Sequence, residues 1–233
     1  MTPKSLNLLV LGRGKTGALV ADVARERGHR VRAVGAAENE GARLLSPTVL
    51  REIDGVVDFT TPHVVLANID ACARSGASMV VGTTGWYGEM ERVRKLVERS
   101  GIGFVFGANF SIGVNLFFEI VRSATIAASV HGYEARILER HHVHKKDAPS
   151  GTAVAMRNIV REAGGGEAQI ASEREGEVVG YHELVLESPS DTITLAHNAK
   201  SRRGFAEGAV RAAEWLAGRK GFYDFKDVWR DLR

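Results

Sequence analysis

The residues best suited to chemistry are three histidines and two lysines that lie within six positions. They are His141, His142, His144, Lys145 and Lys146. Buried together, these side chains would repel one another, so convergence on a bound anion explains them better. A histidine, with an unperturbed pKa of about 6.5, can hold or donate a proton near neutral pH. The cluster therefore predicts proton transfer beside an anion.

A helix is expected to begin directly after this cluster. Pro149 sets its entry, and Ser150, Gly151 and Thr152 form its first residues. Hydroxyl groups and the free N–H groups of a helix N-terminus together bind carboxylates well. A lysine of the cluster supplies point charge for a second carboxylate. We therefore expect a site for an anionic small molecule.

Three simpler explanations of the cluster remain open. A zinc site is disfavoured because the histidine spacings are short and no cysteine or well-spaced acid completes it, so no metal is expected. A basic surface loop would not require the Pro149–Thr152 sequence. A capped helix preceded by solvated charges would explain Ser150 alone.

A glycine-rich loop near the N-terminus is the second chemical feature. It matches G-x-G-x-x-G between an expected strand, 6–11, and an expected helix, 16–27, which is the context that a dinucleotide site requires. The glycines allow a tight turn and close approach of the backbone, and the helix start offers N–H groups to pyrophosphate. The loop consists of Gly12, Arg13, Gly14, Lys15, Thr16 and Gly17.

For a nicotinamide dinucleotide, the choice between NADH and NADPH is open at this point. Glu38 is the nearest acid that could hold the ribose hydroxyls of NADH, although residues 35–37 separate it from the second strand. A solvated loop charge is the equal alternative for Glu38. Arg13, Lys15 and Arg32 could instead face the 2′-phosphate of NADPH. These cations favour NADPH, or use of both cofactors.

The elements that position these residues change in type along the chain. Expected strands at 6–11, 31–34, 55–59, 79–81 and 104–106 alternate with helices, which predicts an α/β fold with a parallel sheet. Four strand ends carry small or polar residues, at 12–17, 60–62, 82–84 and 108–109. Ligands bind beyond the carboxyl ends of such strands, so these ends predict one site.

After residue 109 the pattern becomes that of an α+β region. A helix is expected at about 114–128, a strand at 133–139, a helix after Ser150, and antiparallel strands at 177–186 and 192–196. A last helix is expected at 204–217. The change of pattern predicts two domains.

Composition excludes several classes of protein. No segment reaches the roughly 20 apolar residues that cross a bilayer, so no membrane partner is expected. A net charge of +3 with scattered basic residues does not indicate nucleic acid as a partner. Cys72 is the single cysteine, which excludes an internal disulfide and fits a reducing compartment, and its place on the apolar side of a helix predicts a buried side chain. We expect a cytoplasmic protein.

Along nearly its whole length the chain resembles the dihydrodipicolinate reductase family, also named 4-hydroxy-tetrahydrodipicolinate reductase. The string from His141 to Thr152 is specific to that family. The resemblance implies a Rossmann-type domain, residues 1–108 plus 204–233, with an inserted α+β domain for substrate and oligomerisation, residues 109–203. The other matching stretches are the glycine loop, 58–62, 81–85, 108–115, 174–176, 179–182 and 201–202.

The resemblance implies NADPH- or NADH-dependent reduction of a cyclic dicarboxylate in lysine biosynthesis by a homotetramer. By motif position, His141 matches the catalytic histidine and Lys145 the catalytic lysine. The substrate contacts match His142, Ser150, Gly151 and Thr152. The cofactor contacts match the six residues of the glycine loop with Gly82, Thr83, Thr84, Gly107, Ala108, Asn109 and Phe110. Asn109 and Phe110 are also expected at the hinge between the domains. For Phe110, packing in the core is an equal alternative.

The chain departs from the family pattern in three ways. Its glycine loop is one residue shorter, with Lys15 where arginine is common. No acidic residue directly follows the second strand, where the family has one. The long segment that the family has between the helix after Thr152 and the strand at Arg174 is reduced to a short loop, residues 164–166. We interpret the last change as a lost loop. Rival interpretations are a dehydrogenase of an amino-acid semialdehyde or of aspartate, and a nicotinamide sensor without catalysis.

Overall fold

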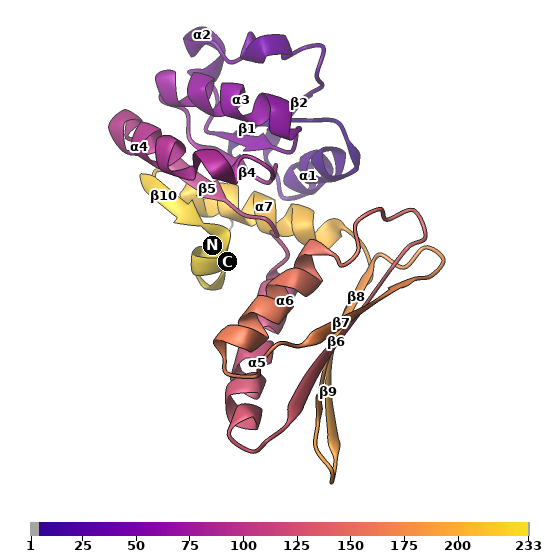
Figure 1. Ribbon diagram of the computed structural model, residues 1–233. Coiled ribbons are helices and arrows are strands. Elements are labelled where there is room, and N and C mark those ends of the chain that lie inside the picture. Colours follow the sequence, from indigo (N-terminus) through magenta and orange to yellow (C-terminus); the bar gives the residue numbers. More distant parts are fainter. Residues whose placement is uncertain (1–4, 233) are drawn as a thin grey trace. The chain divides into compact units, whose positions relative to one another are not determined.

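Five strands from the first half of the chain and one from its last part, β10, form a six-stranded parallel sheet (Figure 1). The structure, a computed structural model, describes residues 5–232. The order of the strands is β10-β5-β4-β3-β1-β2, and every neighbouring pair is parallel. Runs of Val, Leu and Phe form the central strands because both faces of this sheet are covered. The strands are β1 (Asn7–Leu11), β2 (Arg30–Val34), β3 (Gly55–Asp58), β4 (Met79–Val81), β5 (Gly103–Phe106) and β10 (Gly221–Asp224).

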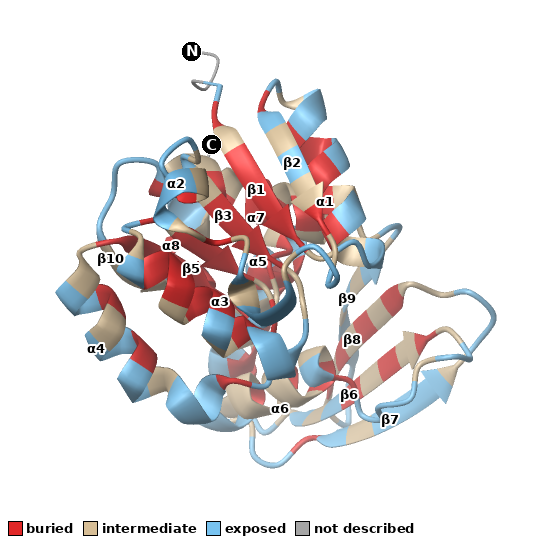
Figure 2. Cartoon of the chain, turned by 90° about the horizontal axis from the view of Figure 1, so that it is seen from above, coloured by how far each residue is buried: buried red, intermediate tan, exposed pale blue. Residues whose placement is uncertain are grey.

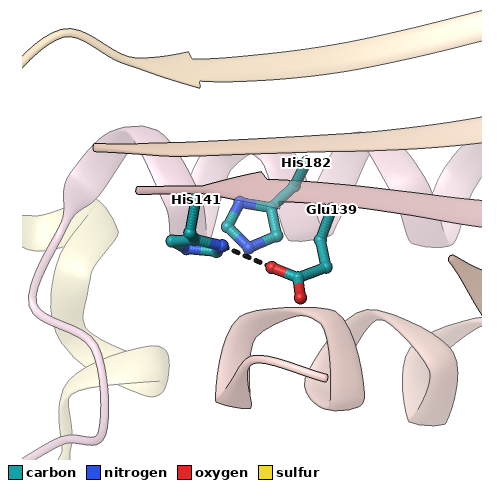
Figure 3. A group of neighbouring side chains, drawn as sticks. All are labelled: Glu139, His141 and His182. Atoms are coloured by element: carbon teal, nitrogen blue, oxygen red, sulfur yellow. Dashed lines mark hydrogen bonds and ion pairs between the residues drawn. The ribbon is translucent and has the colours of Figure 1, made fainter. Parts of the chain in front are cut away.

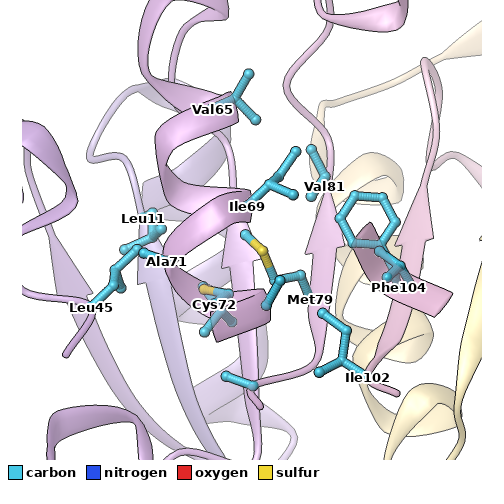
Figure 4. Packing of buried hydrophobic residues seen from close by; sticks show 14 of the residues in the cluster. Leu11, Leu45, Val65, Ile69, Ala71, Cys72, Met79, Val81, Ile102 and Phe104 are labelled. Carbon is cyan, nitrogen blue, oxygen red and sulfur yellow. The ribbon is translucent and has the colours of Figure 1, made fainter. Parts of the chain in front are cut away.

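Helices cover both faces of this sheet (Figures 1 and 2). On one face, α3 (Pro62–Arg74) and α4 (Met90–Ser100) pack against side chains such as those of Met79 and Val81 (Figure 4). On the other face lie α1 (Lys15–Glu26) and α7 (Arg203–Leu216). Cys72 lies in the α3 layer and is fully buried, as predicted. The α/β prediction is confirmed.

Charged side chains connect α7 to the residues that follow α1. The Arg27 guanidinium donates two hydrogen bonds to Glu214 on α7, at 2.8 and 2.7 Å. The Nε2 atom of His29 lies 2.8 Å from the same carboxylate. These contacts add to the apolar packing of α7, through residues such as Ala209 and Val210, against the first sheet. Shorter elements complete this unit: η1 (Glu40–Ala42), α2 (Pro47–Leu50), η2 (Tyr87–Glu89), α8 (Phe225–Val228) and η3 (Trp229–Asp231).

The middle of the chain forms a second unit around a four-stranded sheet. Its order is β7-β6-β8-β9, with β6 and β7 parallel and the other pairs antiparallel. Figure 2 shows alternate residues of β6 and β8 buried, because α5 and α6 cover only one face. The elements are α5 (Ile112–Ser129), β6 (Glu134–His141), α6 (Gly151–Glu162), β7 (Gln169–Arg174), β8 (Gly180–Glu187) and β9 (Thr192–Ala199).

By length and composition alone, α5 is apolar enough to cross a membrane. About 33% of its 18 residues are buried within the structure. Its buried face, with Phe117, Val121 and Ala128, packs in the core of the second unit beside α6 and the sheet. The core helices of many soluble proteins pass the same test, so this feature by itself is weak evidence for a membrane segment.

The two units divide the chain at nearly the expected positions. One unit ends at Ile112 and resumes at Arg203, and the other is Gly113–Arg202. The expected boundaries, 108/109 and 203/204, lie a few residues away. A more consequential difference is the end of β6, which continues to His141 rather than stopping at Glu139. Residues two apart in a strand share one face, so these two side chains point the same way.

Candidate active site

The glycine loop lies at the carboxyl end of β1 and leaves room for a ligand at one position. A Cβ on Gly12 would lie 2.2 Å from the Phe59 carbonyl oxygen, and a Cβ on Gly17 would lie 2.1 Å from that of Gly12. These two glycines are required by packing. A Cβ on Gly14, the N-cap of α1, would meet no described atom within 4 Å. Among residues 5–232 no side chain caps this helix, so its first N–H groups fit a pyrophosphate.

A buried carboxylate joins two other loops at this edge of the sheet. Asp58, fully buried at the end of β3, accepts hydrogen bonds from the hydroxyls of Thr60 and Thr83, each at 2.7 Å, and from the Asn68 amide at 2.8 Å. Thr83 in turn accepts from the Thr60 N–H at 2.8 Å. Burial raises the pKa of Asp58, although these hydrogen bonds oppose it. The Thr83 side chain is thus engaged within the protein, whereas Thr84 is exposed.

The loop after β5 is built mainly for packing. Phe110 is buried, and its ring lies 4.5 Å from that of Phe225 and 6.1 Å from that of Phe59. A Cβ on Gly107 would lie 2.8 Å from the Phe225 Cβ, while Ala108 is exposed. The packing alternative for Phe110 is therefore correct for its side chain, which leaves its backbone as the part that a cofactor could contact.

Glu38 lies at the end of β2, where sequence alone could not place it. Its carboxylate accepts from the Gly35 N–H at 2.8 Å and pairs with Arg13 at 2.8 Å. Arg13 also donates to the Ala33 carbonyl at 2.9 Å. Both charged side chains are substantially exposed. An acid and a cation thus occupy the position that commonly selects between ribose hydroxyls and a 2′-phosphate.

In the second unit, β6 and β8 bring an acid and two histidines together (Figure 3). Glu139 is fully buried and one of its oxygens bonds the Nδ1 atom of His141. The His182 ring packs edge-on to His141, with ring centres 5.1 Å apart. Burial lowers the pKa of His141, although the Glu139 charge opposes this shift. The His141 imidazole is therefore favoured in its neutral form when no ligand is near.

His182 connects this pair to the start of α6. Its Nε2 atom lies 3.1 Å from the Ser150 hydroxyl, and that hydroxyl accepts the Ala153 N–H at 3.2 Å as the predicted helix cap. Burial and the nearby His141 lower the pKa of His182 to about 4. His182 is thus neutral near pH 7. Its Nδ1 atom is buried without a hydrogen-bond partner in the part of the chain described.

Lys145 lies in the loop between β6 and α6 and is paired with an acid. Its ammonium donates to both Asp147 oxygens, at 2.7 and 2.8 Å. The Lys145 side chain is only 22% exposed, whereas that of Asp147 is 60% exposed. The Arg174 side chain of β7 donates to the Asp147 carbonyl at 2.6 Å and to the Glu139 carboxylate at 3.0 Å. Arg174 therefore connects the lysine loop to the buried acid.

The histidine cluster divides between the interior and the surface. His142 is half-buried, with Nε2 3.4 Å from the Arg202 guanidinium and a buried Nδ1 atom that has no partner within residues 5–232. His144 and Lys146 are exposed, and His144 lies 3.7 Å from Glu177. Within the cluster, Lys145 lies close enough to His141 to influence its pKa, whereas the His142 ring lies beside that of His144, with ring centres 6.2 Å apart.

By distance, Glu139, His141 and His182 could also hold a metal ion, since their ligand atoms lie within 4.8 Å of one another. Both oxygens of Glu139 are already engaged, one by His141 and the other by Arg174. A carboxylate between a guanidinium and an imidazole N–H fits proton transfer better than metal binding. The sequence placed Glu139, Arg174 and His182 only within an expected strand, 133–139, and two stretches typical of the family, 174–176 and 179–182, and assigned them no roles. The signal that could have revealed Glu139 and His182 is the alternation of buried residues along β6 and β8.

Family models match almost the whole chain. The N-terminal model of dihydrodipicolinate reductase matches residues 6–110, and the C-terminal model matches residues 113–229. A 4-hydroxy-tetrahydrodipicolinate reductase from Christiangramia forsetii is 34% identical over 242 residues, covering 97% of this chain and 99% of its own. One from Pseudomonas fluorescens is 40% identical over 210 residues, covering 79% and 76%.

A solved structure has the same fold. Dipicolinate-bound dihydrodipicolinate reductase from Paenisporosarcina sp. TG-14 aligns with a TM-score of 0.79 at 21% identity, covering 97% of this chain and 100% of that one. The parallel sheet with an inserted mixed-sheet unit is thus an architecture known from this family. Taken with the family models and the curated relatives, it shows that the chain belongs to the dihydrodipicolinate reductase family.

Proposed function

We propose that the chain is an NAD(P)H-dependent 4-hydroxy-tetrahydrodipicolinate reductase of diaminopimelate and lysine biosynthesis, acting in the cytoplasm. The observation that carries this proposal is the joining of His141, Lys145 and the Ser150-capped start of α6 within one unit. The relatives named above carry the same activity in their names, and one solved relative binds dipicolinate.

The substrate would be held by the second unit. Ser150, Gly151 and Thr152 open α6, where N–H groups favour a carboxylate. Lys145 supplies a positive charge that now faces Asp147 and that a substrate carboxylate can share. A Cβ on Gly151 would meet no described atom within 4 Å, which leaves room for close approach. His142, whose Nδ1 atom has no hydrogen-bond partner among the described residues, is the proposed contact for a carboxylate oxygen.

The cofactor would be held by the first unit. We assign the pyrophosphate to the loop from Gly12 to Gly17, because Gly14 is open and the start of α1 is uncapped by any described side chain. The loops at 82–84 and 107–110 border the same edge of the sheet. When bound, the dihydronicotinamide supplies the hydride. We propose that either cofactor is accepted, since Glu38 suits ribose hydroxyls and Arg13 suits a 2′-phosphate.

His141 is the proposed proton donor. In the overall reaction the substrate loses water and gains a hydride and a proton. His141 takes up a proton at its free ring nitrogen and passes it to the reduced ring, while the Glu139 charge stabilises the imidazolium. Lys145 and the helix start hold the substrate in place through these steps.

Turnover by variants tests this assignment. Product freshly made by dihydrodipicolinate synthase would be supplied with NADH or NADPH, and cofactor oxidation followed by absorbance. We expect His141→Gln to lower kcat by about 10²–10⁴-fold, because a positioned proton donor is lost. Lys145→Ala should lower kcat/KM by a comparable factor, and Lys146→Ala, an exposed neighbour, should leave both constants unchanged. Wild-type turnover by both His141→Gln and Lys145→Ala would refute the proposal.

We also propose a homotetramer assembled through the second sheet. The face of β6 and β8 opposite the helices carries half-buried apolar residues, Leu138 and Val185, among charged ones. Light scattering should give four chain masses. A monomer at working concentration would exclude this assembly without affecting the proposed chemistry.

A further inference from the structure

Glu139 is a charged group with no exposed surface, and its two carboxylate oxygens contact His141 and Arg174. One oxygen bonds the Nδ1 atom of His141, and the other accepts a hydrogen bond from Arg174 at 3.0 Å. Burial raises the pKa of Glu139, but hydrogen bonds from Ser172 and Arg174, with the charges of His141 and Arg174, outweigh burial and lower it. The carboxylate is therefore ionised, and an ionised carboxylate only accepts hydrogen bonds.

This contact determines which nitrogen of His141 carries hydrogen. Because Glu139 can only accept, the Nδ1 atom must donate, and the neutral ring then has its lone pair on Nε2. The Nε2 atom points toward Gly180 on β8, where a Cβ would lie only 3.2 Å away. Glycine at this position places no side chain of its own against that nitrogen. The His141 ring is thus fixed through Nδ1 by Glu139, and Gly180 does not block Nε2.

Arg174 extends the same arrangement to the lysine loop. Besides Glu139, its guanidinium donates to the Asp147 carbonyl at 2.6 Å and to the Lys145 carbonyl at 3.4 Å. Its side chain is 20% exposed. One guanidinium therefore fixes both the acid behind His141 and the backbone that carries Lys145. A lysine could not make these contacts together, because it lacks a planar fork.

We infer that Glu139 and Arg174 are positioning residues: Glu139 holds His141 as the Nδ1–H tautomer with Nε2 as its working nitrogen, and Arg174 couples this ring to the Lys145 loop. The part concerning catalysis rests on the proposed function. The part concerning the tautomer does not.

The charge of Glu139 also influences the pH range in which His141 is protonated. An opposite charge in contact favours the imidazolium, and removing it lowers the pKa of His141 further below its usual value. A proton donor must be protonated to act, so the fall in kcat at high pH should then begin at lower pH. The other groups near His141 are Arg174 on β7, His182 on β8, and Lys145 and Asp147 in the loop, while His197 on β9 lies near His182.

The tautomer can be observed without any turnover. Solid-state ¹⁵N NMR of protein labelled in its histidine rings distinguishes protonated from unprotonated nitrogens, and the His141→Gln spectrum identifies the His141 signals. At pH 8 we expect a protonated Nδ1 and an unprotonated Nε2 in the wild type. The opposite tautomer, or an even mixture, would overturn the inference. Because this readout needs no substrate, an inactive wild type would refute the proposed function and leave this result standing.

Kinetics of variants test the positioning roles. In Glu139→Gln we expect kcat at pH 8 to fall at least tenfold, KM to stay within about twofold, and the alkaline limb of the kcat profile to move down by about one pH unit. Glu162→Gln, an exposed acid at the end of α6, is the matched control and should not differ from the wild type. If Glu139→Gln kept the wild-type pH profile, Glu139 would have only a structural role.

Arg174→Lys provides a second test should Glu139→Gln not fold. It keeps the positive charge and loses the fork, so the tautomer of His141 should be retained while kcat/KM falls about tenfold as the Lys145 loop loosens. An unchanged kcat/KM in Arg174→Lys would refute the coupling of the two residues.

Discussion

The two units prepare for their ligands by different means. The edge of the first sheet offers mainly backbone, namely an uncapped helix start and glycines whose missing side chains leave space or permit close packing. The site of the second unit offers side chains, each held by another, from Arg174 through Glu139 to His141. A dinucleotide pyrophosphate needs only N–H groups and room, whereas proton transfer needs one nitrogen in one protonation state.

The buried carboxylates of the two units show the same contrast. Asp58 and Glu139 are both fully buried, yet burial raises the pKa of Asp58 while the pKa of Glu139 is lowered. The partners of Asp58 are hydroxyls and amides, which are neutral. Those of Glu139 include a guanidinium and an imidazole. Around Asp58 neutral donors shape the loops without overcoming the effect of burial on its pKa, whereas around Glu139 the charged partners help to overcome it.

The largest effect is expected from alanine at Gly17. Its Cβ would lie 2.1 Å from a backbone oxygen that cannot move aside easily, so we expect a loss of about 3 kcal/mol in the free energy of unfolding, measured in urea. Gly14→Ala should keep the wild-type stability and raise the Kd for NADH about tenfold, measured by fluorescence titration, because the added methyl fills the open position. Equal NADH affinity in Gly14→Ala would contradict our assignment of the pyrophosphate.

Removing the charge of each buried acid should lower the stability of the protein by different amounts. Glu139→Gln leaves Arg174 without its charged partner, and we expect it to lower the free energy of unfolding by about 2 kcal/mol. Asp58→Asn should lower it by only about 1 kcal/mol, because the amide oxygen can still accept from Thr60 and Thr83 although the new NH2 group faces the donating Asn68 amide. Urea denaturation at pH 7 measures both. Equal losses of stability in the two variants would mean that the charge of the hydrogen-bond partners does not determine how much each carboxylate contributes.

A smaller change tests the space beside His141. In Gly180→Ala the Cβ would lie 3.2 Å from Nε2, so the ring must shift by a few tenths of an ångström. We expect kcat to fall about tenfold, since small misplacements of a catalytic group are costly, with little change in stability. Gly88→Ala, where a Cβ meets no described atom within 4 Å, is the control. Full activity in Gly180→Ala would show that the working nitrogen lies elsewhere.

The first unit could be predicted from sequence more completely than the second. Strand and helix positions and the glycine loop follow from local hydrophobic runs and from Gly12, Gly14 and Gly17, because each feature depends on adjacent residues. The edge strand β10 was not predicted, since its four residues, Gly221–Asp224, carry no distinctive pattern and it is held by pairing with β5. The position of Glu38 required the turn that brings it back to Gly35.

In the second unit, the residue types were predictable and their pairing was not. His141, Lys145 and Ser150 stand out by type and motif, but Arg174, which binds the backbone of the Lys145 loop, comes from β7, and His182, which contacts Ser150, comes from β8. Which strand lies beside β6, and in what register, is decided by contacts distant in sequence. The prediction that β6 ends at Glu139 also concealed that this residue and His141 share a face.

The smallest effect, and the most direct test of the comparison, is the pH dependence of stability. The pKa of Asp58 is raised above its usual value of 3.8, so the folded state binds the proton more tightly and gains stability as pH falls from neutral toward 3.8. The pKa of Glu139 is lowered below 4.5, so its contribution persists at neutral pH and is lost only as pH falls below about 4.5. Between pH 7 and pH 4, the free energy of unfolding of the wild type should therefore rise relative to that of Asp58→Asn by about 1.4 kcal/mol for each unit by which the pKa of Asp58 is raised.

The difference in free energy of unfolding between the wild type and Glu139→Gln should stay constant over most of this pH range and should decrease only below about pH 4.5. Urea denaturation of the three proteins at pH 7, 5.5, 4.5 and 3.5 separates the two curves, and parallel curves would mean that both carboxylates carry the same charge in the folded protein.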